Sequence, residues 1–217
     1  MTGYRRRQIE GWTLQVSNVL RDKHAATCAT ALKALEHQLY HATRVIPGAA
    51  VRKLQRVTIW VEWDSSKVSH APCMCYHPNP QWLADHGVPP RKAYGIDLTN
   101  ARNFLAWTIE QPAMVIHELA HAYHHRFLPG GFDNPAVRRA YESAKRSRRY
   151  SRVLRINGQI RRAYAMTNVM EYFAEGSEAL FGTCDFYPFV RSELKQHDPR
   201  GYRVLRQAWG LKAEAKR

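Results

Sequence analysis

The sequence predicts a single α+β domain that is mostly helical and has a small, largely antiparallel sheet. Apolar residues recur at helical spacing in several long segments, whereas strict alternation is confined to short ones. The strongest hairpin signal joins two neighbouring strands, which pair antiparallel. The 217 residues contain no internal repeat and no Pro/Gly/Ser-rich linker, so residues 1–217 are expected to form one domain.

Two strands and one long helix are expected in the first part of the chain. Residues 9–16 are typical of a short strand. Apolar residues at intervals of three and four predict an amphipathic helix over 22–44, which ends before Pro47. Alternation predicts a strand over 54–63. Pro, His, Gly and Cys fill 64–90, where we expect an irregular loop that carries binding groups.

A strand and three helices are expected next. The strand lies at 93–98, and Asn100 begins a helix that continues to about residue 109. Pro112 suits the first turn of the following helix, which ends at Pro129. A strongly basic helix is expected over 134–150.

A hairpin and two helices complete the chain. Asn157 and Gly158 stand between two runs that contain apolar residues, which is the pattern of a two-residue hairpin turn. Thr167 or Asn168 would cap a helix that runs to about residue 181. A last helix follows Pro199.

Composition excludes several classes of protein. Hydrophobic residues make up 45% of the chain, which excludes wholesale disorder. No apolar run approaches the roughly 20 residues of a membrane-spanning helix, so no membrane span is expected. The four cysteines are too few and too irregularly spaced for a disulfide scaffold. The first residues lack the apolar core of a signal peptide, which favours the cytoplasm over secretion but leaves the compartment open.

The chain is strongly basic, and its charge is concentrated in one segment. Lys and Arg number 33 against 18 Asp and Glu, which gives a net charge of +15. The Arg138 to Arg162 run holds ten cations and the single acid Glu142. Such a run is either a solvated surface or a binding site for an acidic substrate or a polyanion.

The expected helix after Pro112 contains His117-Glu118-Leu119-Ala120-His121, the H-E-x-x-H pattern. Four residues advance a helix by about 400°, so the two histidines project from one face and can bind one zinc ion. Glu118 would flank them as a general base. The alternative is a core helix with two buried histidines, which would need hydrogen-bond partners.

A third metal ligand must come from another segment. His124 lies seven residues after His117, about 10 Å along the helix axis, so it and His125 are expected near the rim or behind the ligands. Glu171, Glu175 and Glu178 follow on one face of a later helix. One would bind the metal and another would hold a ligand histidine, and spacing alone leaves open which one does either. A solvated position is an alternative for Glu178.

Residues 164–175 carry a resemblance to a known family. Their sequence is Tyr-Ala-Met-Thr-Asn-Val-Met-Glu-Tyr-Phe-Ala-Glu. Together with 115–121, this string resembles the catalytic site of the anthrax lethal factor type of zinc metallopeptidase, a gluzincin. The resemblance implies a zincin-like fold in which His117, His121 and Glu171 bind Zn²⁺.

The resemblance also implies catalytic roles. Glu118 would be the general base, Tyr164 would donate a hydrogen bond to the oxyanion, and Glu175 would brace a ligand histidine. The expected activity is that of a zinc-dependent endopeptidase acting on a peptide or protein substrate through a zinc-bound water. The strand at 54–63 would align the peptide if it forms an exposed edge. No targeting or translocation domain is visible, so a toxin role does not carry over.

Two other functions remain open. The chain could be a basic nucleic-acid-associated protein, or a peptide-binding pseudoenzyme, with a structural zinc site in either case. The presence of Glu118 and Tyr164 argues against the pseudoenzyme, because neither is needed to hold the metal. Cys73 and Cys75 could form a second metal site or block the zinc, although free thiols are expected from their spacing. Aromatic residues of the loop could line the cleft, namely Trp82, His86 and Tyr94.

Overall fold

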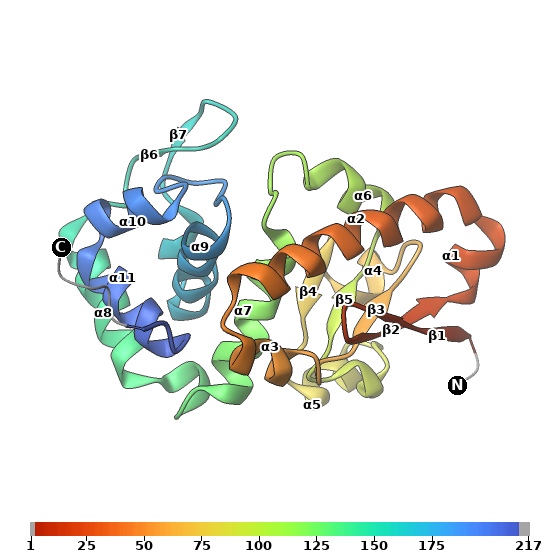
Figure 1. The fold of residues 1–217 in the computed structure, drawn as a ribbon. Helices are drawn as coiled ribbons and strands as arrows, with labels where there is room; N and C mark the ends of the chain where they lie inside the picture. The colour runs from red at the N-terminus through yellow and green to blue at the C-terminus, as the bar shows by residue number, and fades with distance from the viewer. Residues whose placement is uncertain (1–2, 213–217) are drawn as a thin grey trace.

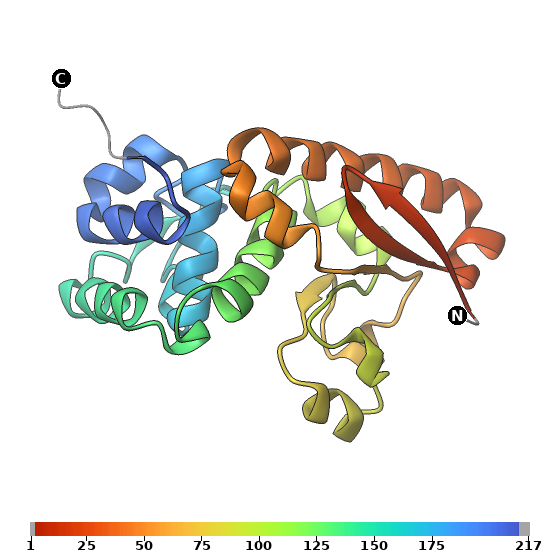
Figure 2. The same cartoon turned by 60° about the horizontal axis from the view of Figure 1, so that its bottom comes forward.

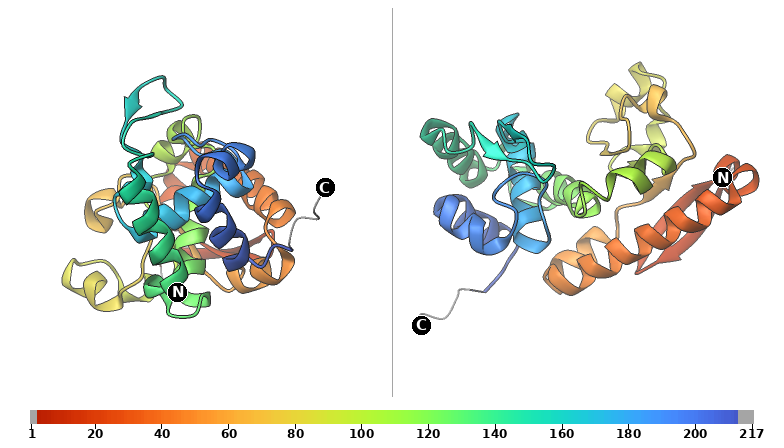
Figure 3. Two further views of the ribbon diagram at one scale, coloured as in Figure 1. Left: turned by 90° about the vertical axis from the view of Figure 1, so that its left-hand side faces the viewer. Right: turned by 90° about the horizontal axis from the view of Figure 1, so that it is seen from above.

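A computed structural model describes residues 3–212 and has the predicted α+β class (Figure 1). The first half of the chain contains the main sheet, and the second half is helical apart from one small hairpin. Seen from above, these halves lie on either side of helix α7 (Met114–Phe127), which is green in Figure 3. The buried apolar residues form one continuous cluster that includes both halves. Within residues 3–212, no helix combines the length and the apolar content needed to cross a bilayer.

The sheet begins with a hairpin that the sequence predicts with wrong bounds. Strands β1 (Tyr4–Ile9) and β2 (Trp12–Ser17) pair antiparallel, so the expected strand at 9–16 in fact spans a turn. Glu10 and Gly11 both have positive φ, 49° and 85°, as a tight two-residue turn requires. Polar residues fill β1, which therefore lacks the alternation that would reveal a half-buried strand.

The sheet is mixed rather than largely antiparallel. Its strand order is β1-β2-β3-β5-β4, with β3 at Ile59–Val61, β4 at Met74–Tyr76 and β5 at Ile96–Leu98. Strand β3 pairs parallel with both β2 and β5, whereas β4 pairs antiparallel with β5. Parallel strands need a long connection that returns the chain to the same end of the sheet, and helices provide this connection between β2 and β3.

Those connecting helices account for the long apolar pattern of the first half. They are α1 (Asn18–Lys23), α2 (Ala25–Val45) and α3 (Gly48–Leu54). Figure 2 shows α2 running along the β1–β2 hairpin. The expected helix is confirmed, with a break at His24, and α2 buries Leu32, Leu35 and Leu39.

The strand expected at 54–63 is shorter and lies elsewhere than the peptide-binding hypothesis requires. Only β3 is extended there, and it is buried between β2 and β5. A central strand has no free edge, so the prediction that this segment aligns a peptide is wrong.

The segment 64–90 is also more regular than expected, because it supplies the outer strand β4. It further contains α4 (Ser66–Ser69), α5 (Pro80–Asp85) and the start of the 3₁₀ helix η1 (Pro90–Lys92). A buried ion network fixes its end: Lys92 Nζ lies 2.8 Å from both Glu62 Oε1 and Asp97 Oδ2. Strand β4 also contacts α7, through the Tyr76 hydroxyl, 2.9 Å from His125 Nδ1.

The second half agrees more closely with the sequence. Besides α7, its elements are α6 (Ala101–Trp107), η2 (Gly131–Asp133), α8 (Pro135–Ser147), β6 (Val153–Leu154), β7 (Ile160–Arg161), η3 (Tyr164–Met166), α9 (Val169–Phe181), α10 (Arg191–His197) and α11 (Pro199–Ala208). Asn100, Asn134 and Asn168 cap α6, α8 and α9 with side-chain oxygens. Pro199 begins α11 as expected, whereas α10 was not predicted.

Candidate metal centre

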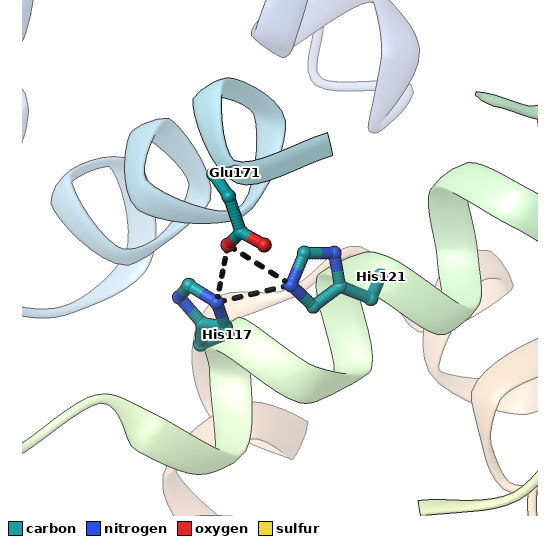
Figure 4. Close-up of side chains that lie close together, drawn as sticks. All are labelled: His117, His121 and Glu171. Carbon is teal, nitrogen blue, oxygen red and sulfur yellow. Dashed lines mark hydrogen bonds and ion pairs between the residues drawn. The ribbon is translucent and has the colours of Figure 1, made fainter. Parts of the chain in front are cut away.

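Two helices bring three potential metal ligands together. His117 and His121 lie one turn apart on α7, and Glu171 lies in the first turn of α9, which packs against α7 (Figure 4). The two histidine Nε2 atoms are 3.0 Å apart. Glu171 Oε2 lies 3.1 Å from Nε2 of His117 and 3.3 Å from Nε2 of His121. The structure therefore brings together the three candidate ligands that the sequence and the resemblance indicate.

The triangle formed by these atoms fits a small divalent cation. Ligand atoms at about 2.0–2.1 Å from a tetrahedral zinc ion are about 3.3 Å from one another. The three observed separations, 3.0, 3.1 and 3.3 Å, are close to that value. Two histidines and one glutamate are also a donor set that zinc takes in hydrolases.

Glu178, rather than Glu175, holds a ligand histidine. Its Oε1 lies 2.6 Å from Nδ1 of His117, on the side of the ring away from Glu171. The prediction that Glu175 braces a ligand histidine is therefore corrected, since Glu175 Oε2 instead lies 3.5 Å from the Cys184 thiol, which donates to it. Glu178 is only 3% exposed, which also excludes the alternative of a solvated position.

The charges at the centre compensate for burial. Burial lowers the pKa of His117, but its hydrogen bonds to Glu171 and Glu178 outweigh this, and the net shift is upward. Burial raises the pKa of Glu171, yet its bonds to the two histidines hold it well below its usual range. Burial raises the pKa of Glu178 to about 7, although His117 opposes the shift. A proton between Nδ1 of His117 and Glu178 leaves Nε2 as the coordinating nitrogen.

Glu118 lines a cleft together with the candidate ligand His117. Glu118 is only 7% exposed, and its Oε2 has no hydrogen-bond partner among the described residues. The cleft has a volume of about 360 Å³. It is lined by Pro72, Cys73, Met74, Trp107, Gln111, Met114, His117, Glu118, Arg155, Arg161, Tyr164, Glu175, Glu178, Asp185 and Phe186. A buried carboxylate oxygen without a partner is costly, so a hydrogen-bond donor that reaches Oε2 would stabilise Glu118.

Tyr164 lines the same cleft from the 3₁₀ helix η3. Its side chain is half-exposed, and its ring centroid lies 6.4 Å from that of His117. Burial raises the pKa of Tyr164, and the nearby Glu171 carboxylate raises it further. The phenol therefore keeps its proton near neutral pH and can donate it in a hydrogen bond.

The two histidines that follow on α7 lie away from the cleft. His124 is fully buried between Phe173 and Phe132, and burial lowers its pKa to about 3. His125 stacks on Phe132 and bonds to Tyr76. The prediction that these residues form the rim or a second layer of the site is wrong: one is a core residue and the other joins α7 to β4.

The cysteines are free thiols, as the sequence indicates. Burial raises the pKa of Cys73 to about 12, and its Sγ lies 3.4 Å from the Met114 sulfur. Burial also raises the pKa of Cys75 well above its usual range. Neither residue belongs to a group of three potential ligands within residues 3–212, so the structure does not favour a second metal site there. The loop aromatics do not line the cleft; Trp82 instead stacks on His86 at 4.0 Å.

Several cleft residues have no signal in the sequence that links them to the site. Arg155 and Arg161 belong to the basic run, and Asp185 follows α9. Trp107 reaches the cleft from the end of α6. Only the three-dimensional arrangement identifies these four residues.

Comparisons with protein-family profiles, curated proteins and solved structures find no match to this chain. The resemblance to gluzincins therefore rests on the motifs alone, and the assignment of an activity rests on the geometry of the site.

Proposed function

We propose that the chain is a zinc-dependent endopeptidase with a zincin-like active site. The observation that carries the proposal is the triangle of His117, His121 and Glu171 atoms, next to a cleft that both His117 and Glu118 line. A purely structural zinc site is normally closed by four protein ligands. Here three candidate ligands are grouped together and one of them, His117, lines a cleft, which supports a catalytic site.

The chain's own side chains would divide the chemistry among them. A Zn²⁺ ion held by the three ligands would act as a Lewis acid and make a water molecule more acidic. Glu118 would accept a proton from the attacking water at Oε2, and later deliver it to the leaving amine. Tyr164 would donate its hydroxyl hydrogen to the oxygen of the former carbonyl as negative charge develops there.

Strand β4 would bind the peptide main chain. Thr99 N donates to Cys73 O, and His77 N donates to Gly95 O. The main-chain groups of Cys73 and His77, which flank β4, therefore point toward β5. Because bonding direction alternates along a strand, the main-chain groups of Met74 and Tyr76 point to the outer edge. Cys73 and Met74 line the cleft, so an extended peptide pairing with this edge would lie beside the metal ligands.

Glu118→Gln tests the proposal. The amide keeps the shape of the side chain but cannot accept the proton, so zinc content should stay stoichiometric while cleavage of a degenerate peptide library falls by a factor of about 10²–10⁴. Metal analysis and cleavage are measured on the same purified sample. Cleavage at the wild-type rate by the variant would refute the role of Glu118. Stoichiometric zinc without cleavage in either protein would favour the peptide-binding alternative.

A further inference from the structure

A strip of exposed cations leads from α8 to the cleft. It consists of Arg138, Arg139, Lys145, Arg146, Arg148, Arg149, Arg152, Arg161 and Arg162, which we call the basic strip. The chain that carries it leaves α8 and rises to the β6–β7 hairpin (Figure 1). Glu142 is the one acid in this stretch of sequence, and it is only partly exposed. Arg138 forms an ion pair with Asp133, and the strip as a whole carries a clear excess of positive charge.

Arg161 joins the basic strip to the cleft. It lies at the end of β7, is exposed, and lines the cleft together with Glu118 and Tyr164. No ion pair of Arg161 with an acid occurs among residues 3–212. Its charge is therefore available to a ligand.

Among the other charged groups that line the cleft, Arg155 and Glu178 have ion-pair partners within the protein, whereas Glu118 Oε2 has none among the described residues. Arg155 lies 3.0 Å from Asp185 and 3.6 Å from Glu110, and Glu178 bonds to His117. Among the described residues, Arg161 is the lining arginine that forms no ion pair with an acid, so it is suited to bind a carboxylate.

The surroundings of the strip favour a polypeptide over a single-stranded nucleic acid. Between residues 138 and 162 the aromatic residues are Tyr141 and Tyr150, and both are buried, so the strip itself has no exposed ring on which bases could stack; the exposed rings nearby, Tyr164 and Trp107, line the cleft. The hairpin instead exposes Leu154, Ile156 and Ile160, which are between 42% and 54% exposed. Aliphatic side chains next to cations match a substrate segment that mixes apolar and acidic residues.

We propose that the substrates are polypeptides with an acidic segment, an inference that rests on the proposed peptidase function. Their carboxylates bind Arg161 and the basic strip, and the adjoining main chain enters the cleft. Arg161 is the residue that sets the preference close to the metal ligands, while the rest of the strip attracts the acidic segment from a greater distance.

Two degenerate peptide libraries, one containing Glu and Asp and one with Gln and Asn in their place, test this preference. We expect the wild-type protein to cleave the acidic library with about tenfold higher kcat/KM at low salt. Arg161→Gln should lower the acidic-to-neutral ratio about fivefold, the value of one charged contact at a partly solvated site. Combining Arg139→Gln, Arg146→Gln and Arg152→Gln should lower it further and reduce its dependence on salt.

Arg5→Gln is the matched control, because Arg5 is an exposed cation on β1, at the opposite side of the sheet from β4. It should leave the acidic-to-neutral ratio unchanged. A wild-type protein that cleaves both libraries equally would overturn the inference and leave the peptidase proposal intact.

Binding separates failure of the inference from failure of the proposed function. Fluorescence anisotropy with a labelled Glu-rich peptide is measured on the Glu118→Gln protein. This variant is expected to cleave the peptide very slowly, so binding can be measured without turnover. Salt-sensitive binding that Arg161→Gln weakens supports the inference even if no peptide is cleaved. Absence of binding at low salt, or binding of duplex DNA more tightly than of the peptide, overturns it.

Discussion

Glu178→Gln is expected to weaken zinc binding because it removes a carboxylate that a bound cation would keep ionised as the partner of a ligand histidine. The carboxylate lies 2.6 Å from Nδ1 of His117, and its side chain is only 4% exposed, so solvent cannot substitute for it. An amide oxygen can still accept the Nδ1 hydrogen but carries no charge. Loss of such a partner typically lowers metal affinity 10–100-fold, or about 1.4–2.7 kcal/mol. Competition with a chromophoric chelator measures the change.

Glu175→Gln is the control for this prediction. Glu175 lies in the same buried region, but its bonding partner is the Cys184 thiol, and burial together with Glu178 raises its pKa well above the usual range. A glutamine is close in shape and charge to a protonated glutamate, so zinc affinity should change less than threefold. An equal or larger loss in Glu175→Gln than in Glu178→Gln would refute the assignment of Glu178 as the partner of His117.

Three further changes test the catalytic and structural roles. Tyr164→Phe should lower kcat about 10²–10³-fold with little change in KM or zinc content, and an unchanged kcat would exclude the oxyanion role. Apoprotein stability should fall as pH rises from about 4.5 to 7, because burial raises the pKa of Glu178 to about 7 and shifts the pKa of Glu175 in the same direction, so the folded protein retains protons that the unfolded chain releases. Denaturant titrations in chelator should show this slope, and Glu178→Gln should reduce it. Gly201→Ala should cost about 1–3 kcal/mol, because its methyl group would meet the Tyr172 hydroxyl and the Asp198 carboxylate; an unchanged melting temperature would contradict this packing.

Helices could be predicted where the residues within or next to a single helix show its periodicity or its cap. In α2 the buried leucines recur at three and four residues, and in α9 the capping Asn168 directly precedes the helix. Strands β3, β4 and β5 have three residues each, which is too short for alternation to define their bounds. Their order depends on helical crossovers and burial, so the sequence does not distinguish the central strand β3 from the outer strand β4.

The candidate site follows the same division. His117 and His121 share a helix, so their spacing alone predicts that they face the same ligand. The choice between Glu175 and Glu178 depends on how α9 is rotated against α7, because three residues along a helix change direction by about 300°. That rotation is set by packing throughout the interface, and the local sequence does not specify it. The resemblance to gluzincins identified the region but assigned the contact to Glu175, the wrong turn of the helix.

The energetics of the α7–α9 interface connect stability to the proposed chemistry. Glu118, Glu175, Glu178 and Asp185 are all buried around one cleft, and Arg155 is the arginine that pairs with an acid there. Burying so many carboxyl groups is unfavourable unless they are protonated, paired with a base or close to a cation. The raised pKa values of Glu175 and Glu178 favour the protonated, neutral forms of these two carboxyl groups when no metal is bound. A divalent cation at the neighbouring ligands would favour the ionised forms instead, so the arrangement that costs stability in the apoprotein is the one that a zinc-dependent hydrolase requires.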